Sequence, residues 1–130
     1  MRLVLDTNIY CDYAEGIEET VGFMATYGED IYIPSIVMGE LTFGFMKGKR
    51  QKFIEDKLRQ IVSGLGIEII DVTANVARKY AIIYLNLVKK GTKIPINDIW
   101  IAACCMEKGG TLLTRDKHFE YVKQVESIIL

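Results

Sequence analysis

Four acidic residues stand at positions where a parallel sheet would bring them together. Asp6 comes directly after a short apolar segment, and Asp116 follows another by two residues. Asp98 begins an apolar helical segment, and Glu40 lies early in a second one. The C-terminal strand ends of an open parallel sheet form its ligand crevice, and helices begin at the same edge. We therefore expect the four carboxylates to converge on one site.

Convergence of four carboxylates has a chemical consequence. Acids that meet without partners repel one another, and one or more of them would take up a proton. Divalent cations remove this conflict, and ligands that are all oxygen select hard ions such as Mg²⁺ or Mn²⁺ rather than Zn²⁺. Such ions activate water and neutralise the charge that develops on phosphate. The residue types therefore predict metal-dependent hydrolysis of a phosphodiester.

Each acid taken alone has a simpler interpretation. Asp6 can cap a helix, Asp98 can match a helix dipole, and Asp116 can form a turn. Glu40 can be a solvated helix residue. However, Glu40 and Asp98 adjoin apolar residues, beside which a charge is costly unless it has a partner. The four acids together therefore favour a site.

Short apolar segments alternate with longer helical ones, which predicts an α/β fold with a mainly parallel sheet. The expected strands are residues 2–5, 31–33, 68–70, 111–114 and 127–130. The expected helices are residues 36–46, 49–63, 74–90 and 98–108. Their expected N-caps include Ser35, Thr73 and Asn97, and Gly91 should end the third helix.

Size and composition are consistent with one globular domain over residues 1–130. Half of the residues are hydrophobic, but no apolar run reaches the roughly 18 residues of a membrane span. An acid at position 6 interrupts the N-terminal apolar segment before it could serve as a signal peptide, so we expect a cytoplasmic protein. The three cysteines have neither a disulfide pattern nor zinc-ligand spacing.

The net charge of −1 does not exclude a nucleic acid as substrate. Without the four candidate acids, 13 acidic residues remain against 16 Lys and Arg, so the rest of the chain carries +3. A site that binds divalent cations would also stop repelling phosphate.

The segments around the four acids resemble the motifs of the PIN domain, and most closely those of the VapC-type toxins of bacterial and archaeal toxin–antitoxin pairs. The segments that carry the resemblance are Leu5-Asp6-Thr7-Asn8, Gly39-Glu40-Leu41, Asn97-Asp98-Ile99-Trp100-Ile101-Ala102-Ala103 and Thr114-Arg115-Asp116-Lys117-His118-Phe119. They follow the family's order and cover essentially the whole chain.

This resemblance implies a three-layer α/β/α sandwich with a four- to five-stranded sheet and a Mg²⁺- or Mn²⁺-dependent endoribonuclease. The four acids match the family's metal-site positions. The polar positions that usually support that site match Thr7, Asn8 and Thr114. Such toxins usually form homodimers, and a small antitoxin lays a peptide across the groove. The filled acidic positions argue against an inactive copy, and the short chain favours a toxin.

Basic residues near the candidate site suggest how RNA could be held. Lys49 and Arg50 belong to a basic run that could contact phosphates, although a solvated helix face is the alternative. Arg115 could hold phosphate or pair with a site acid. For His118, the only histidine, we expect a structural or peripheral role, because metal-bound water already has a lowered pKa.

Aromatic and apolar helix residues have a simpler expected role. Trp100 should pack in the core or at a dimer interface, and Tyr84 and Leu85 could extend the helix of residues 74–90 towards such an interface.

Other functions fit parts of the sequence. One is a PIN nuclease in RNA processing or decay, without an antitoxin. Another is a non-catalytic acidic-pocket domain for binding or for signalling of the phospho-acceptor receiver type. The receiver interpretation is weakened by a single early acid, Asp6, and by the lack of a fitting mid-chain strand-end acid except Asp71. A phosphatase with an Asp-x-Asp motif is disfavoured because residue 8 is Asn.

Overall fold

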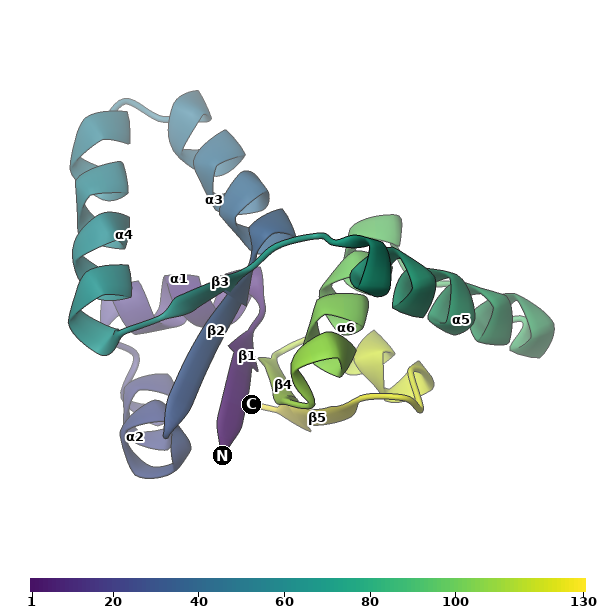
Figure 1. Cartoon of the computed structure of the whole chain (residues 1–130). Helices are drawn as coiled ribbons and strands as arrows, with labels where there is room; N and C mark the ends of the chain where they lie inside the picture. Colours follow the sequence, from purple (N-terminus) through teal and green to yellow (C-terminus); the bar gives the residue numbers. More distant parts are fainter.

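The computed structural model describes all 130 residues and contains one sheet of five parallel strands flanked by helices (Figure 1). The strands are β1 (Arg2–Leu5), β2 (Asp30–Pro34), β3 (Glu68–Ile70), β4 (Thr111–Thr114) and β5 (Glu126–Ile129), in the spatial order β3-β2-β1-β4-β5. The helices are α1 (Thr7–Glu15), α2 (Glu18–Tyr27), α3 (Ser35–Lys47), α4 (Gln51–Leu65), α5 (Ala74–Lys90), α6 (Ile96–Lys108) and the short 3₁₀ helix η1 (Lys117–Tyr121).

The layers match the predicted α/β/α sandwich. Helices α1 and α2 lie on one side of the sheet, and α5 and α6 lie on the other (Figure 1). A parallel sheet covered on both faces needs strands that are apolar throughout. The central strands β1 and β4 meet this need, because Leu3 to Leu5 and Thr111 to Thr114 are all buried.

The register of β1 and β4 decides which residues share an edge. Leu5 pairs with Leu113, and the Asp6 amide donates to the Leu113 carbonyl at 3.1 Å. Asp6 and Thr114 therefore lie side by side where the two central strands end. This is the edge at which the sequence predicted a site.

Two predicted helix caps are confirmed as such, one at the start and one at the end of α5. The Thr73 hydroxyl accepts a hydrogen bond from the Val76 amide at 3.3 Å. Gly91 ends the helix with a φ of 68°, a left-handed conformation that glycine adopts without steric cost.

The caps predicted at Ser35 and Asn97 are wrong. Helices α3 and α6 begin at Ser35 and Ile96, and the residues before them are Pro34 and Pro95. Pro34 and Pro95 themselves occupy the N-cap positions, with extended backbone and no side-chain hydrogen bond to the helix. Asn97 is consequently free to use its amide elsewhere.

Helices α1 and α2 are absent from the helices that the sequence predicts. In α1 the buried set includes the polar residue Asp12, which breaks the apolar periodicity. In α2 the interior residue Gly22 lowers helix propensity by about 1 kcal/mol relative to alanine. Helix α1 nevertheless has local end signals, because the Asp6 side chain caps its start and Gly16 ends it with a φ of 77°.

A single hydrophobic core of 28 buried residues occupies the space between sheet and helices. Trp100 packs against this core, and its ring stacks on Tyr80 with centroids 3.9 Å apart, as predicted for a packing role. None of the helices combines the length and apolar character required to cross a membrane.

Candidate metal centre

Asp6 is the most deeply buried of the four acids, with 5% of its surface exposed. Its Oδ1 accepts from the Thr7 amide at 2.8 Å, which caps α1, and its Oδ2 accepts from the Thr114 hydroxyl at 2.6 Å. Burial raises the pKa of Asp6 more than these hydrogen bonds lower it, and the charges of Glu40 and Asp116 raise it further. The carboxylate is thus fixed in place and electrostatically unfavourable.

Glu40 connects three helices at the same edge. The Thr7 hydroxyl of α1 donates to Glu40 Oε1 at 2.6 Å, and the Asn97 amide of α6 donates to Oε2 at 3.4 Å. Thr7 thereby orients Glu40, and its role in supporting a metal site stays a prediction. Asn97 was missed as a site residue because its place before Asp98 resembles a helix cap.

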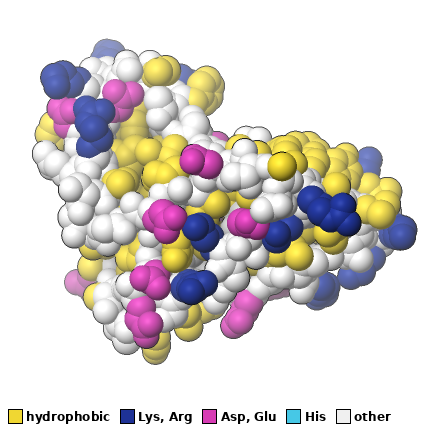
Figure 2. Space-filling view, viewed as in Figure 1, with side chains coloured by type: hydrophobic (Ala, Val, Ile, Leu, Met, Phe, Trp, Pro, Cys, Tyr) yellow, Lys and Arg dark blue, Asp and Glu magenta, His cyan; other side chains and the backbone are white.

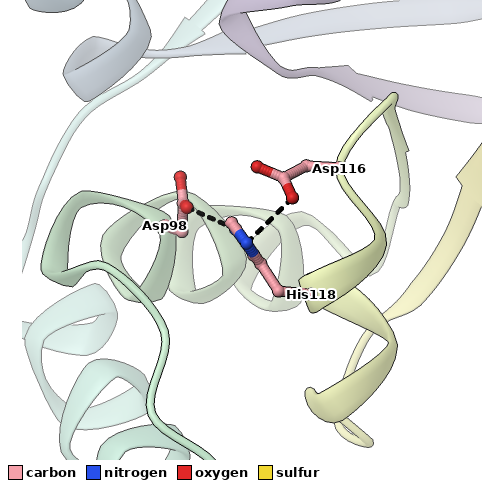
Figure 3. A group of neighbouring side chains, drawn as sticks. All are labelled: Asp98, Asp116 and His118. Carbon is pink, nitrogen blue, oxygen red and sulfur yellow. Dashed lines mark hydrogen bonds and ion pairs between the residues drawn. The ribbon is translucent and has the colours of Figure 1, made fainter.

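Asp98 and Asp116 face each other across the ring of His118 (Figure 3). His118 Nε2 lies 2.6 Å from Asp98 Oδ2, and Nδ1 lies 2.8 Å from Asp116 Oδ1. His118 is therefore not peripheral to the acids, and the structural role that was the other half of the expectation stays a prediction. The tight 3₁₀ turn of η1 carries the ring back into the site, and its position two residues after Asp116 was the available signal.

The loop after β4 is tied to α1 by a second set of contacts. The Asp116 amide donates to the Thr114 hydroxyl at 3.0 Å, and the Arg115 amide donates to Asn8 Oδ1 at 3.3 Å. Arg115 Nε lies 3.0 Å from Asp12 Oδ2. Arg115 therefore pairs with an acid one helical turn beyond Asn8 and not with one of the four site acids.

The electrostatics of Asp98 resemble those of Asp6. Burial raises the pKa of Asp98 to about 6, with further increases from the charges of Asp6 and Asp116, while the contact with His118 acts in the opposite direction. Shared neighbours link all four predicted acids: Thr7 lies between Asp6 and Glu40, Thr114 between Asp6 and Asp116, and His118 between Asp98 and Asp116. Repulsion among these acids is what a bound cation relieves.

The donor atoms suit a divalent cation. Ligand atoms of Asp98, Asp116 and His118 all lie within 4.8 Å of one another, and Asp6 and Glu40 add further carboxylate oxygens nearby. Carboxylates select hard divalent ions. The residues present therefore fit a metal centre.

The two predicted RNA-contact residues Lys49 and Arg50 lie away from this cluster. They occupy the exposed turn between α3 and α4, at the end of α3 that points away from the sheet (Figure 1). Arg50 lies over the Phe53 ring, 4.4 Å from its centroid. Later cations of the same run have internal partners, because Lys52 and Arg59 both pair with Asp56.

Comparison with protein families gives a match to the PIN domain over residues 3–125. The chain belongs to the PIN domain family. The resemblance stated from the four motifs is confirmed. PIN-domain nucleases depend on metal ions, which agrees with the acidic cluster at the sheet edge.

Two named relatives show which members of the family this chain is similar to. Ribonuclease VapC2 of Rickettsia felis is 34% identical, with 100% of this chain and 96% of the relative covered. Ribonuclease VapC5 of Mycobacterium tuberculosis is 25% identical, with 88% and 93% covered.

Solved structures share the fold over almost the full length. The crystal structure of VapBC2 from Rickettsia felis bound to a promoter DNA fragment contains a chain with a TM-score of 0.90 and 27% identity, covering 99% of this chain and 98% of that one. FitAcB from Neisseria gonorrhoeae has a TM-score of 0.82 and 26% identity, covering 97% and 96%. The predicted fold class is thereby confirmed.

Proposed function

We propose that this chain is a metal-dependent endoribonuclease and the toxin component of a toxin–antitoxin pair. The observation that carries the proposal is the convergence of four carboxylates on one sheet edge of a PIN fold. The ribonuclease named among its relatives, 34% identical over the full chain, supports the activity. The toxin role is supported by VapBC neighbours, one of them described as a member of the VapBC family of toxin–antitoxin systems.

The four acids Asp6, Glu40, Asp98 and Asp116 would hold Mg²⁺ or Mn²⁺. When bound, one or two such ions activate water and neutralise charge on the phosphate and on the leaving oxygen. The chain supplies the rigidity that this chemistry needs. Metal-site carboxylates are usually oriented by hydrogen bonds from neighbouring groups. Those donors here are Thr7 and Asn97 on Glu40, and Thr114 on Asp6.

Asn8 and Arg115 would act on Asp116 through the backbone. Asn8 accepts from the Arg115 amide, and the Arg115 side chain is held by Asp12. These contacts keep the loop that carries Asp116 against α1. Arg115 is still half exposed, which leaves its guanidinium able to contact a phosphate of the RNA as well.

RNA phosphates would also be held at the α3–α4 turn. Lys49 and Arg50 are exposed there, and neither is paired with a carboxylate. Cations that contact phosphates strengthen RNA binding and make it depend on salt concentration.

The antitoxin would cover the apolar surface between α3 and α4. Phe43, Met46 and Phe53 are each about 60% exposed, at 62%, 60% and 58%. Between the two helices lies a separate apolar hollow lined by Met38, Leu58 and Val62, where Figure 2 shows hydrophobic side chains gathered. Exposed apolar patches of this kind are typical of protein interfaces. Since α3 also carries Glu40, a peptide that begins on this surface can reach the metal centre.

A homodimer would use the opposite side of the molecule, where α5 is exposed. Ile82, Leu85 and Val88 lie on its outer face with 43%, 55% and 54% of their surfaces exposed, and hydrophobic side chains gather over α5 in Figure 2. Tyr84 lines a groove with Ile94 and Ile96 beside the same helix. An apolar helix face without an intramolecular partner favours a symmetric contact between two copies.

The test is cleavage of structured and single-stranded RNAs by the purified, partner-free protein, with Mg²⁺, with Mn²⁺ and with EDTA. We expect cleavage with metal, none with EDTA, and none by Asp98→Asn. The matched control is Asp30→Asn, which removes an exposed acid at the far end of the sheet and should cleave normally. Cleavage that EDTA leaves intact, or that Asp98→Asn retains, would contradict the proposal.

The toxin role has a separate readout. Expression of the chain alone should stop growth of the host, and co-expression of the small protein encoded beside it should restore growth. RNA cleavage without any neighbouring antagonist would instead favour a PIN nuclease of RNA processing or decay.

A further inference from the structure

His118 is the one residue of the acidic cluster whose side chain offers a nitrogen that can bind a metal ion. Its ring lies between Asp98 and Asp116, and each ring nitrogen is within 2.8 Å of a carboxylate oxygen (Figure 3). The ring is about three-quarters shielded from solvent. Nothing in the proposed function requires a histidine at this point, because the four carboxylates suffice to bind a hard ion.

The two contacts of the ring are both hydrogen bonds only when the imidazole is protonated. A neutral ring has one N–H donor, and its other nitrogen presents a lone pair. A ring between two carboxylates therefore holds either a second proton or a cation at one nitrogen, while the other nitrogen donates to its carboxylate. A cation at that point would be attracted by the nitrogen and by the oxygen alike.

The spacing agrees with shared coordination of one ion. Bonds of about 2.1 Å in octahedral geometry place ligand atoms roughly 3 to 4.2 Å apart. The donor atoms of Asp98, Asp116 and His118 lie within 4.8 Å of one another before any ion draws them together. A histidine ligand usually donates its second N–H to a carboxylate, and a second carboxylate is available here.

We propose that His118 is a nitrogen ligand of the metal centre and gives the site a preference for a transition-metal ion such as Mn²⁺ over Mg²⁺. This inference rests on the metal-dependent activity proposed above. Mg²⁺ binds oxygen donors almost exclusively, whereas imidazole binds transition-metal ions more strongly. An acid cluster of oxygens alone would lack this preference.

Pulsed electron paramagnetic resonance of the Mn²⁺-loaded full chain tests the ligand directly. A nitrogen bound to Mn²⁺ gives a hyperfine coupling to ¹⁴N that a more distant imidazole does not give at the same strength. Because His118 is the only histidine, an imidazole coupling in tag-free protein can come only from this residue. The assignment therefore holds even if a variant at this position folds poorly.

Titration of Mn²⁺ and Mg²⁺ into the parent and into His118→Gln measures the preference. Glutamine can still donate to one of the two carboxylates but offers no imidazole nitrogen. Loss of a ligand should lower Mn²⁺ affinity at least about 10-fold and change Mg²⁺ affinity much less. A residue that only orients the carboxylates would lower both affinities together.

The outcomes separate this inference from the proposed function. A ¹⁴N coupling in the parent, with a Mn²⁺-specific loss in His118→Gln, supports the inference. Mn²⁺ binding that Asp98→Asn abolishes but that shows no ¹⁴N coupling overturns it and leaves the proposed nuclease intact. Failure of the parent to bind either ion would overturn both.

Discussion

Both the metal centre and the α3–α4 turn contain side chains that cost free energy when they have no partner. Only the metal centre pairs them within the chain. At the metal centre, polar groups satisfy one another, as when Asp6 accepts from both Thr7 and Thr114. At the turn, Phe43 and Phe53 remain largely exposed and only cations cover their rings. The first region has its polar groups paired. The second leaves aromatic rings largely exposed, as a binding surface would.

This difference separates catalysis from recognition within one small domain. A preorganised site must have its ligands fixed before substrate arrives, because reorganisation during the reaction is costly. A recognition surface can stay open, since its binding energy is gained only on association. Substitutions in the two regions should therefore have separable effects.

Asp6→Asn should reduce RNA cleavage by on the order of 10²–10³-fold and leave the fold intact. The asparagine oxygen can still cap α1 through the Thr7 amide, and its amide can donate to the Thr114 oxygen in a reversed hydrogen bond, so both contacts keep a partner. Cleavage rate and thermal melting of the metal-free protein are the measurements. A melting temperature well below that of the parent would mean that the acid is structural.

The stability of the metal-free protein should depend on pH through Asp98. Its pKa is raised to about 6 from 3.8, so the folded state holds this proton more tightly than the unfolded state. The resulting stabilisation is present below the unfolded value and is lost as pH rises through about 6. Asp98→Asn cannot ionise and should avoid that loss.

Urea unfolding of parent and Asp98→Asn between about pH 4 and pH 7 measures this effect. The free energy of unfolding of the variant should rise relative to that of the parent by on the order of 2 kcal/mol across that range. Saturating Mn²⁺ should reverse the order in favour of the parent. A difference between the two proteins that is constant with pH would show that burial of Asp98 carries no such penalty.

Phe53→Ala should weaken antitoxin binding about 10-fold while leaving cleavage by the free protein unchanged. The ring is mostly exposed, so its loss removes little core packing. Calorimetry with the antitoxin and RNA cleavage by the same preparation give the two readouts. The matched control is Tyr121→Ala, which removes an aromatic ring that is also half exposed but lies on η1. Equal losses of antitoxin affinity in both variants would contradict the α3–α4 surface as the antitoxin site.

Lys49→Glu and Arg50→Glu should weaken RNA binding a few-fold each and flatten its salt dependence. Each lost phosphate contact lowers the slope of log affinity against log salt by about 0.7 for single-stranded RNA. Fluorescence anisotropy at several salt concentrations measures this. Lys123→Glu, an exposed cation just before β5, is the control. An unchanged slope would mean that the turn is an ordinary solvated surface without phosphate contacts.

Much of the framework was predictable from local sequence. Strands β1, β3 and β4 have the predicted bounds, because buried parallel strands are short apolar segments bounded by polar or turn residues. The four acids were recognisable since charges beside apolar segments need partners. Thr73 and Gly91 mark the ends of α5 through backbone chemistry that needs no distant contact.

Local sequence therefore specifies the α/β pattern and the acids at its strand ends and helix starts. The tertiary structure decided which polar groups meet. His118 reaches Asp98 across 20 positions, and Asn97 reaches Glu40 across 57. Such pairings depend on helix packing and loop path, which local periodicity does not encode. For this reason a cluster that the sequence presented as oxygen only includes a histidine nitrogen in the folded chain.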